Sequence, residues 1–206
     1  RDNETHMSIC KEHEIGLIDL VIVNLYPFKE TISKENVTLE NAIENIDIGG
    51  PSMLRSASKN YRSVGVIVNP KRYDALSDEL NKNSGKLSDK TRAELACEAF
   101  THTAEYDTLI SQYLTTYFQN GSAPTFADST TLTLKKTSDL RYGENPHQEA
   151  ALYQFDKPEG LTAIVQLHGK ALSYNNYIDL EAAWHISREF NEPCATIIKH
   201  TNPCGT

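Results

Sequence analysis

The sequence lacks several features that would place it in a special class of protein. It has no apolar run near the roughly 18 residues that a membrane-spanning helix requires, no secretory signal at its start, and no repeat or low-complexity tract. It also lacks a basic excess, because 28 acidic residues outnumber 20 Lys and Arg residues and leave a net charge of −8. A non-specific nucleic-acid binder normally presents a basic face, so we expect neither a nucleic-acid nor a membrane partner. A nucleotide substrate stays open, because a few local donors can hold a phosphate.

Cysteine is scarce and shows no paired spacing. The four cysteines are Cys10, Cys97, Cys194 and Cys204. We therefore expect a reducing, cytoplasmic compartment. The remaining composition, 39% hydrophobic and 23% charged, is that of an ordinary globular protein with one large or two modest domains. The chain starts at Arg1 rather than Met and stops just after Gly205, within an expected turn, so we expect a fragment of a longer protein.

Two near-continuous apolar runs mark buried strands in the first half. They cover residues 17–25 and 63–68, and such runs are typical of strands in a parallel sheet that is covered on both faces. Helical patterns lie between and after them. The order strand, helix, helix, strand, helix predicts an α/β fold with a parallel sheet.

Capping residues and first-turn prolines mark the helix starts in this half. They are Thr38, Pro51, Asn69 with Pro70, and Ser88. The helix that begins near Pro51 is expected to turn Met53, Leu54 and Ala57 inward.

The longest helical pattern covers residues 89–118, and a break near residues 101–103 is left open. Asn120 and Gly121 are expected to end this helix. A linker follows, so we place the domain boundary between residues 124 and 125.

The second half is predicted to alternate strands with one helix. The strands are expected at residues 130–136, 162–167 and 195–198. Alternation of apolar and polar residues in the first of them predicts one buried face. Asp179 is expected to cap a helix that runs to about Phe190 and turns Leu180, Ala183 and Trp184 inward.

Polar side chains follow the expected strands at their carboxyl ends, where open α/β sheets bind ligands. Lys199 and His200 end the last strand, and a cation beside a titratable imidazole suits chemistry on an anionic substrate. Asn24 and Tyr26 end the first strand. A Lys-His pair more commonly has no role beyond a polar surface, and a tyrosine such as Tyr26 more commonly lies in the core. Both interpretations stay open here.

Five stretches, taken in order, resemble one family. They are residues 23–28, 47–51, 140–148, 172–176 and 198–203. The third, Leu-Arg-Tyr-Gly-Glu-Asn-Pro-His-Gln, is highly specific. The chain resembles, over essentially its whole length, the bifunctional purine-biosynthesis enzymes that join AICAR transformylase to IMP cyclohydrolase.

The resemblance implies two partial α/β domains. Residues 1–124 would be the C-terminal part of a methylglyoxal-synthase-like cyclohydrolase domain with a helical connection. Residues 125–206 would begin a transformylase domain built from cytidine-deaminase-like α/β units. Because the family's N-terminal part and most of its transformylase region would be missing, we expect the chain to be inactive alone.

Formyl transfer to AICAR, the aminoimidazole carboxamide ribonucleotide, needs a base for the amine proton and a charge that stabilises the oxyanion. By resemblance, His200 is the proton acceptor and Lys199 its electrostatic partner. Arg141 and Tyr142 match the AICAR-binding pair, and Asn176 is expected near the same site. Neighbouring residues on a strand point to opposite faces. Lys199 and His200 can therefore act on one ligand only where the strand ends or bends between them.

The cyclohydrolase reaction closes formyl-AICAR to IMP with loss of water. By resemblance, Lys59 handles a proton, and Tyr26 and Asp47 are active-site residues. The nucleotide-binding backbone turns around them are expected at Val23, Asn24, Ile48 and Gly49.

The resemblance also implies the ligands and the assembly. The co-substrate would be 10-formyltetrahydrofolate, no metal would be required, and the enzyme would be a homodimer that binds AICAR, formyl-AICAR and IMP. Two alternatives stay open. One is a zinc-dependent nucleobase deaminase. Such enzymes carry His-x-Glu and Pro-Cys-x-x-Cys motifs, and His147-Gln148-Glu149 and Pro203-Cys204 partly match them. The other is a non-catalytic nucleotide-binding module.

Overall fold

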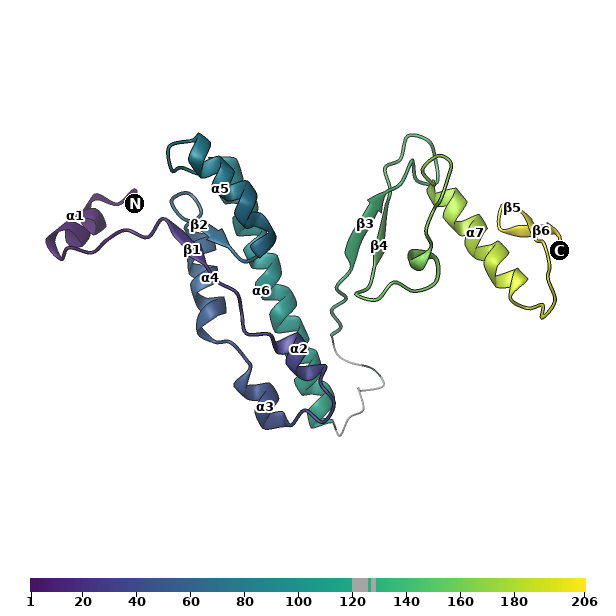
Figure 1. Cartoon of the computed structure of the whole chain (residues 1–206), viewed down its shortest axis with the longest axis horizontal. Helices are drawn as coiled ribbons and strands as arrows, with labels where there is room; N and C mark the ends of the chain where they lie inside the picture. The colour runs from purple at the N-terminus through teal and green to yellow at the C-terminus, as the bar shows by residue number, and fades with distance from the viewer. Residues whose placement is uncertain (120–125, 127–128) are drawn as a thin grey trace. The chain divides into compact units, whose positions relative to one another are not determined.

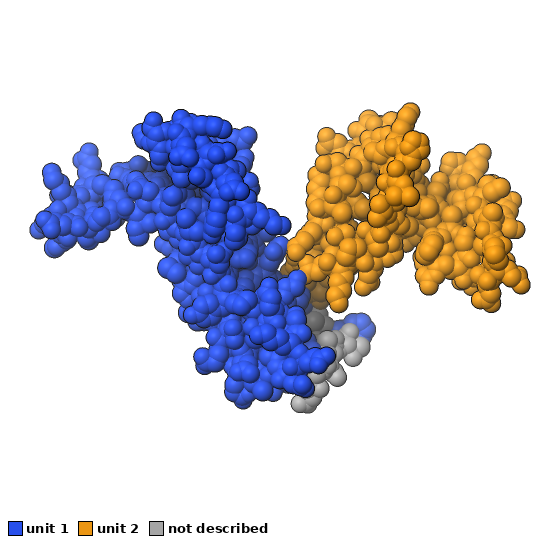
Figure 2. All heavy atoms as spheres, viewed as in Figure 1, with its two compact units in different colours: residues 1–129 blue, residues 130–206 orange. Residues whose placement is uncertain are grey.

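The computed structural model describes residues 1–119, 126 and 129–206, and it divides the chain into two compact units, residues 1–129 and 130–206 (Figure 2). The predicted boundary between residues 124 and 125 lies outside the described residues, as do Asn120 and Gly121, the predicted helix end.

Unit 1 mixes helices with a short parallel sheet (Figure 1). Its elements are α1 (Glu4–Glu12), β1 (Leu20–Ile22), α2 (Phe28–Ile32), α3 (Leu39–Glu44), α4 (Gly49–Lys59), β2 (Gly65–Ile67), the 3-10 helix η1 (Pro70–Arg72), α5 (Tyr73–Lys82) and α6 (Asp89–Phe118). β1 and β2 pair in parallel with Val21 opposite Val66, which confirms the predicted α/β class. Each strand is shorter than its apolar run, because the ladder includes only residues that pair with the neighbouring strand.

Local capping explains where the helices of unit 1 begin. Thr38 accepts a hydrogen bond from the Asn41 amide at 3.2 Å, and Ser88 accepts one from the Thr91 amide at 3.1 Å. Each bond satisfies an amide that has no partner inside its own helix. The predicted starts at Thr38 and Ser88 are confirmed. α6 then runs for 30 residues without the break that the sequence left open.

α6 contributes to two separate hydrophobic clusters. The first cluster comprises Leu54, Ala57, Val66, Ile67, Val68, Leu76, Leu87, Leu95, Ala96 and Ala99. The second comprises Phe28, Ala42 and Tyr106. Leu54 and Ala57 face the core as predicted, but the prediction for Met53 is wrong, because 52% of Met53 is exposed. At about 100° per residue, Ala57 lies between Met53 and Leu54 around the helix, so Met53 stands at the exposed edge of the buried face.

Unit 2 comprises two antiparallel strand pairs and one long helix (Figure 1). Its elements are β3 (Lys135–Asp139), β4 (Ala151–Gln154), the 3-10 helix η2 (Gly160–Ala163), α7 (Tyr174–Ser187), β5 (Ile197–Lys199) and β6 (Asn202–Gly205). β3 pairs with β4, and β5 pairs with β6.

Three predictions for strands in unit 2 need correction. β3 begins at Lys135 rather than at residue 130, and all five of its residues are exposed, so the expected buried face is absent from it. Residues 162–167 form no strand: their first part belongs to η2, and Val165 and Leu167 are exposed. No described strand pairs with that apolar run, and a strand needs a paired neighbour. The last predicted strand covers Ile197–Lys199 instead of residues 195–198, and residues 202–205, expected within a turn, form the further strand β6.

The helix of unit 2 starts earlier than predicted. Ser173 and Asn176 form a capping box, in which each side chain accepts the other's backbone N–H, so α7 begins at Tyr174 rather than after Asp179. It ends at Ser187 rather than near Phe190. Leu180 and Trp184, predicted to face inward, are 39% and 54% exposed.

Candidate functional sites

The Asp47 carboxylate joins two segments of unit 1 at the start of α4. Its Oδ1 accepts a hydrogen bond from the Gly50 amide at 2.7 Å, and its Oδ2 accepts one from the Tyr26 amide at 3.2 Å. The half-buried carboxylate therefore links the segment after β1 to the first turn of α4. The structure brings together two residues that the sequence separates, Tyr26 and Asp47, and leaves the Tyr26 side chain 57% exposed.

Tyr106 on α6 fixes the backbone around Asp47. Its hydroxyl accepts from the Asp47 amide at 2.9 Å and donates to the Asn45 carbonyl at 3.1 Å. Burial raises the pKa of the Tyr106 hydroxyl, so this group stays protonated and can both donate and accept. Sequence reasoning missed this residue, because nothing local relates position 106 to position 47.

The other four residues predicted at this site lie close by in the chain and differ in exposure. Val23 is half-buried, and its amide donates to the Ile67 carbonyl at 3.1 Å. Asn24, Ile48 and Gly49 are exposed. Gly49 begins α4, directly after Asp47 and Ile48.

Gly50→Ala is expected to destabilise unit 1 at this site. An added Cβ would lie 2.6 Å from Leu25 Cδ2 and 2.7 Å from Asp47 Oδ2, so the Asp47 carboxylate or α4 would have to move. We expect a loss of about 1–3 kcal/mol in the free energy of unfolding, measured by urea denaturation. Gly49→Ala is the matched control, because its Cβ would meet nothing within 4 Å. Equal stability of the two variants would contradict the tight packing at Gly50.

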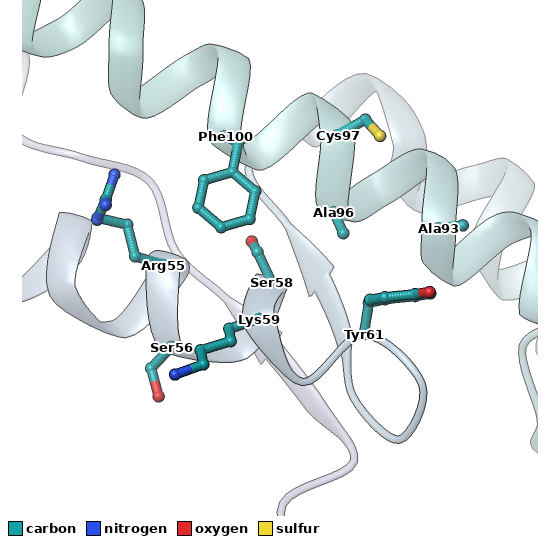
Figure 3. A pocket seen from close by; sticks show the side chains of 9 residues that line it. All are labelled: Arg55, Ser56, Ser58, Lys59, Tyr61, Ala93, Ala96, Cys97 and Phe100. Carbon is teal, nitrogen blue, oxygen red and sulfur yellow. The ribbon is translucent and has the colours of Figure 1, made fainter.

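Lys59 lies at the other end of α4, away from Tyr26 and Asp47. At 1.5 Å per residue the helix separates Lys59 from Gly49 by about 15 Å. Lys59 lines a pocket of about 780 Å³ between α4 and α6 (Figure 3). The pocket is lined by Arg55, Ser56, Ser58, Lys59, Tyr61, Ala93, Ala96, Cys97 and Phe100. The structure therefore does not bring Lys59 beside the Asp47 cluster.

The pocket around Lys59 combines charge with an aromatic surface. The Arg55 guanidinium carbon lies 5.7 Å from the centre of the Phe100 ring, a distance typical of a cation–π contact. Arg55 and Lys59 both come from α4, whereas Phe100 comes from α6 (Figure 3). Two cations and an aromatic face suit a planar anionic ligand.

Arg141, Tyr142 and Asn176 form a cluster in unit 2. Arg141 Nη2 donates to the Tyr142 hydroxyl at 3.3 Å and to Asn176 Oδ1 at 3.4 Å, and its guanidinium carbon lies 4.9 Å from the centre of the Tyr142 ring. The structure thus places Asn176 beside Arg141, where the sequence analysis expected it. An exposed guanidinium on an aromatic face suits recognition of an anionic ligand.

Backbone pairing holds the Arg141 loop against the start of α7. The Arg141 amide donates to the Leu172 carbonyl at 2.9 Å, and the Tyr174 amide donates to the Tyr142 carbonyl at 3.0 Å. The Asn175 side chain also donates to the Glu144 carbonyl at 2.9 Å. The loop rich in polar side chains is therefore anchored to a helix end, which fixes the backbone of Arg141.

Lys199 and His200 lie where β5 ends. β5 stops at Lys199, and His200 and Thr201 adopt positive φ angles of 50° and 62° in the turn to β6. The geometric condition for Lys199 and His200 to act on one ligand is therefore met. The Thr201 amide donates to Asp179 Oδ1 on α7 at 2.8 Å, a contact that the sequence analysis missed because it assigned Asp179 to a helix cap.

Within residues 1–119, 126 and 129–206, no group of three or more His, Cys, Asp and Glu side chains could hold a metal ion. In the same part of the chain, no helix is both long and apolar enough to cross a membrane.

Known proteins resemble this chain along its whole length. The model of the AICARFT/IMPCHase bienzyme family matches residues 57–206, and the model of the MGS-like domain matches residues 2–52. The chain is 54% identical over 206 residues to the bifunctional purine biosynthesis protein PurH of Thermoanaerobacter sp. (strain X514), and 54% identical over 207 residues to that of Bacillus subtilis (strain 168). Each alignment covers 100% of this chain and 40% of the relative.

A solved structure is also similar. The crystal structure of ForH superposes with a TM-score of 0.51 at 28% sequence identity, over 60% of this chain and 62% of that chain.

Proposed function

The chain belongs to the AICARFT/IMPCHase bienzyme family, and from that premise we propose that it is part of an enzyme for the last two steps of purine biosynthesis. The first step transfers a formyl group from 10-formyltetrahydrofolate to AICAR. The second closes formyl-AICAR to IMP with loss of water. The chain spans 40% of the length of its curated relatives, so both activities belong to a longer protein that contains it, here called the full-length protein.

One observation supports the transfer step most strongly. Asn176 and Asp179 stand three positions apart on α7, so they lie on one face of the helix. Asn176 accepts a hydrogen bond from Arg141, and Asp179 accepts one from Thr201, in the turn that contains His200. One helix face therefore contacts both the proposed AICAR-binding cluster and the segment with the proposed base.

The residues have distinct roles in the proposed transfer. Arg141, Tyr142 and Asn176 bind AICAR. The 5-amino nitrogen of AICAR forms a bond to the formyl carbon, and His200 accepts the proton that this nitrogen loses. Lys199 stabilises the negative charge on the formyl oxygen. The bond from that carbon to the folate nitrogen then breaks, and the released nitrogen takes up a proton.

Cyclisation joins the carboxamide nitrogen of formyl-AICAR to the formyl carbon, and the formyl oxygen leaves as water. We assign Tyr26, Asp47 and Lys59 to this step, with Val23, Asn24, Ile48 and Gly49 as the surrounding nucleotide-binding turns. Asp47 is the best-supported of the three, because two backbone amides fix its carboxylate.

The proposal extends to the assembly and the compartment. We infer a homodimer in the cytoplasm that acts on small molecules, without a metal, a nucleic acid or a membrane as partner. The four cysteines, all within the described residues, are free thiols, as a reducing compartment requires.

The test is turnover by the purified full-length protein. Given AICAR and 10-formyltetrahydrofolate, it is expected to form formyl-AICAR and then IMP, followed by absorbance and by chromatography of the products. The 206-residue chain alone is expected to form neither. AICAR binding without any product from the full-length protein would instead favour a non-catalytic binding module, and stoichiometric zinc in it would favour a deaminase.

A further inference from the structure

The turn between β5 and β6 has an unusual backbone. Lys199 pairs with Asn202 across the hairpin, so His200 and Thr201 are the two residues of the turn. Their φ angles of 50° and 62° are those of the tight hairpin turn that normally uses Asn and Gly. A positive φ is unfavourable for a residue with a Cβ, and most of all for a β-branched one such as Thr201. This conformation therefore needs support from its surroundings.

Hydrogen bonds from two sources provide that support. Within the turn, the Thr201 hydroxyl donates to the His200 carbonyl at 2.7 Å, and the Asn202 side chain donates to the same carbonyl at 2.8 Å. From outside the turn, half-buried Asp179 on α7 accepts the Thr201 amide at 2.8 Å. An ionised acceptor makes a stronger bond than a neutral one. The contact with Asp179 fixes the turn relative to α7.

We propose that Asp179 is a positioning residue, which holds the His200 imidazole in place relative to the AICAR-binding cluster. The same helix face carries Asn176, which contacts Arg141, so α7 sets the distance between the two parts of the site. Without the Asp179 carboxylate, His200 and Thr201 are free to relax to negative φ, which redirects the imidazole. This inference rests on the proposed function, because it assumes that His200 is the base.

The test compares four variants of the full-length protein. Asp179→Ala removes the acceptor, and because Ala is a better helix former than Asp, α7 is expected to persist. Asp179→Asn keeps a side-chain oxygen that can accept the Thr201 amide. Glu181→Ala is the matched control, since it removes an exposed carboxylate from the same helix. His200→Ala reports on the proposed base itself.

Asp179→Ala is expected to lower kcat for formyl transfer by about 10- to 100-fold, the effect of a misplaced catalytic group. KM for AICAR should change by less than about twofold, because Arg141 and Tyr142 remain. Asp179→Asn should recover most of the rate, and Glu181→Ala should match the wild type. Cyclisation of supplied formyl-AICAR should be unchanged in all variants. Hydrogen exchange of the peptide that covers β5 and β6 should speed up in Asp179→Ala alone.

Each other outcome overturns a specific statement. If Asp179→Ala transfers formyl groups at the wild-type rate while His200→Ala has lost formyl transfer, the positioning role is overturned and the proposed function stays intact. Asp179→Asn as slow as Asp179→Ala overturns the role of the hydrogen bond, and loss of both activities makes Asp179 structural. Wild-type transfer by His200→Ala overturns the proposed function. If Asp179→Ala does not fold, Asp179→Asn is compared with Asp179→Ser by hydrogen exchange and by kcat. Because the serine side chain is shorter, we expect Asp179→Ser to lose the bond to the Thr201 amide, with faster exchange and a lower kcat. Equal values for the two variants would overturn the positioning role.

Discussion

His200→Ala is expected to slow formyl transfer by at least about 10²- to 10⁴-fold in the full-length protein, the usual effect of losing a general base. The imidazole follows directly after β5, in the turn that Asp179 holds. AICAR binding should weaken only modestly, because Arg141, Tyr142 and Asn176 are untouched. Cyclisation of supplied formyl-AICAR should persist, because its proposed residues belong to unit 1.

The pH profile of transfer distinguishes a base from a residue that only binds. A protonated imidazole cannot accept a proton, so the wild-type rate should fall on the acid side, and that limb should vanish in His200→Ala. Lys199→Ala should also slow transfer, through loss of charge near the oxyanion. Lys199→Arg is expected to rescue little, since a planar guanidinium differs in shape and reach from an ammonium group. An unchanged acid limb in His200→Ala would remove His200 from the mechanism.

Lys59→Ala is expected to abolish cyclisation, by more than about 10²-fold, and to leave formyl transfer largely intact. Its amine is exposed at the pocket between α4 and α6, where it can exchange protons with a bound ligand and with water. The measurement is IMP formation from supplied formyl-AICAR, beside transfer by the same preparation. Lys82→Ala is the matched control, because Lys82 is the exposed last residue of α5 as Lys59 is of α4.

The outcome also decides between two parts of unit 1, because α4 separates Lys59 from Asp47. Wild-type cyclisation by Lys59→Ala would leave the Asp47 cluster as the candidate site and deprive the pocket of a role. Loss of both activities, in protein that is still folded, would make Lys59 structural.

Helix starts were predictable because a cap is a local interaction. Thr38 and Ser88 each bond an amide three residues ahead, so the pattern and the contact lie in the same short stretch. Asp179 shows how the same logic fails when two caps compete. An acidic residue before an apolar pattern is typical of a cap, yet the reciprocal bonds of Ser173 and Asn176 start α7 six residues earlier.

Strands and exposed faces in unit 2 were harder to predict, because they depend on partners far along the chain. The run at residues 162–167 is apolar enough for a strand but pairs with none that is described. Of the site, Arg141 and Asn176 could be associated only through the resemblance, since 35 residues separate them. Tyr106 carried no local signal at all.

The continuity of α6 has a consequence for chain length. Ala99 packs in the first cluster and Tyr106 in the second, and both belong to the same uninterrupted helix. The number of residues between them is therefore fixed by the two contacts. One inserted residue would turn everything after it by about 100°, so the Tyr106 hydroxyl would swing away from Asn45 and Asp47 while Leu95 stayed in place. Insertions and deletions are therefore not tolerable between the two contact points of α6.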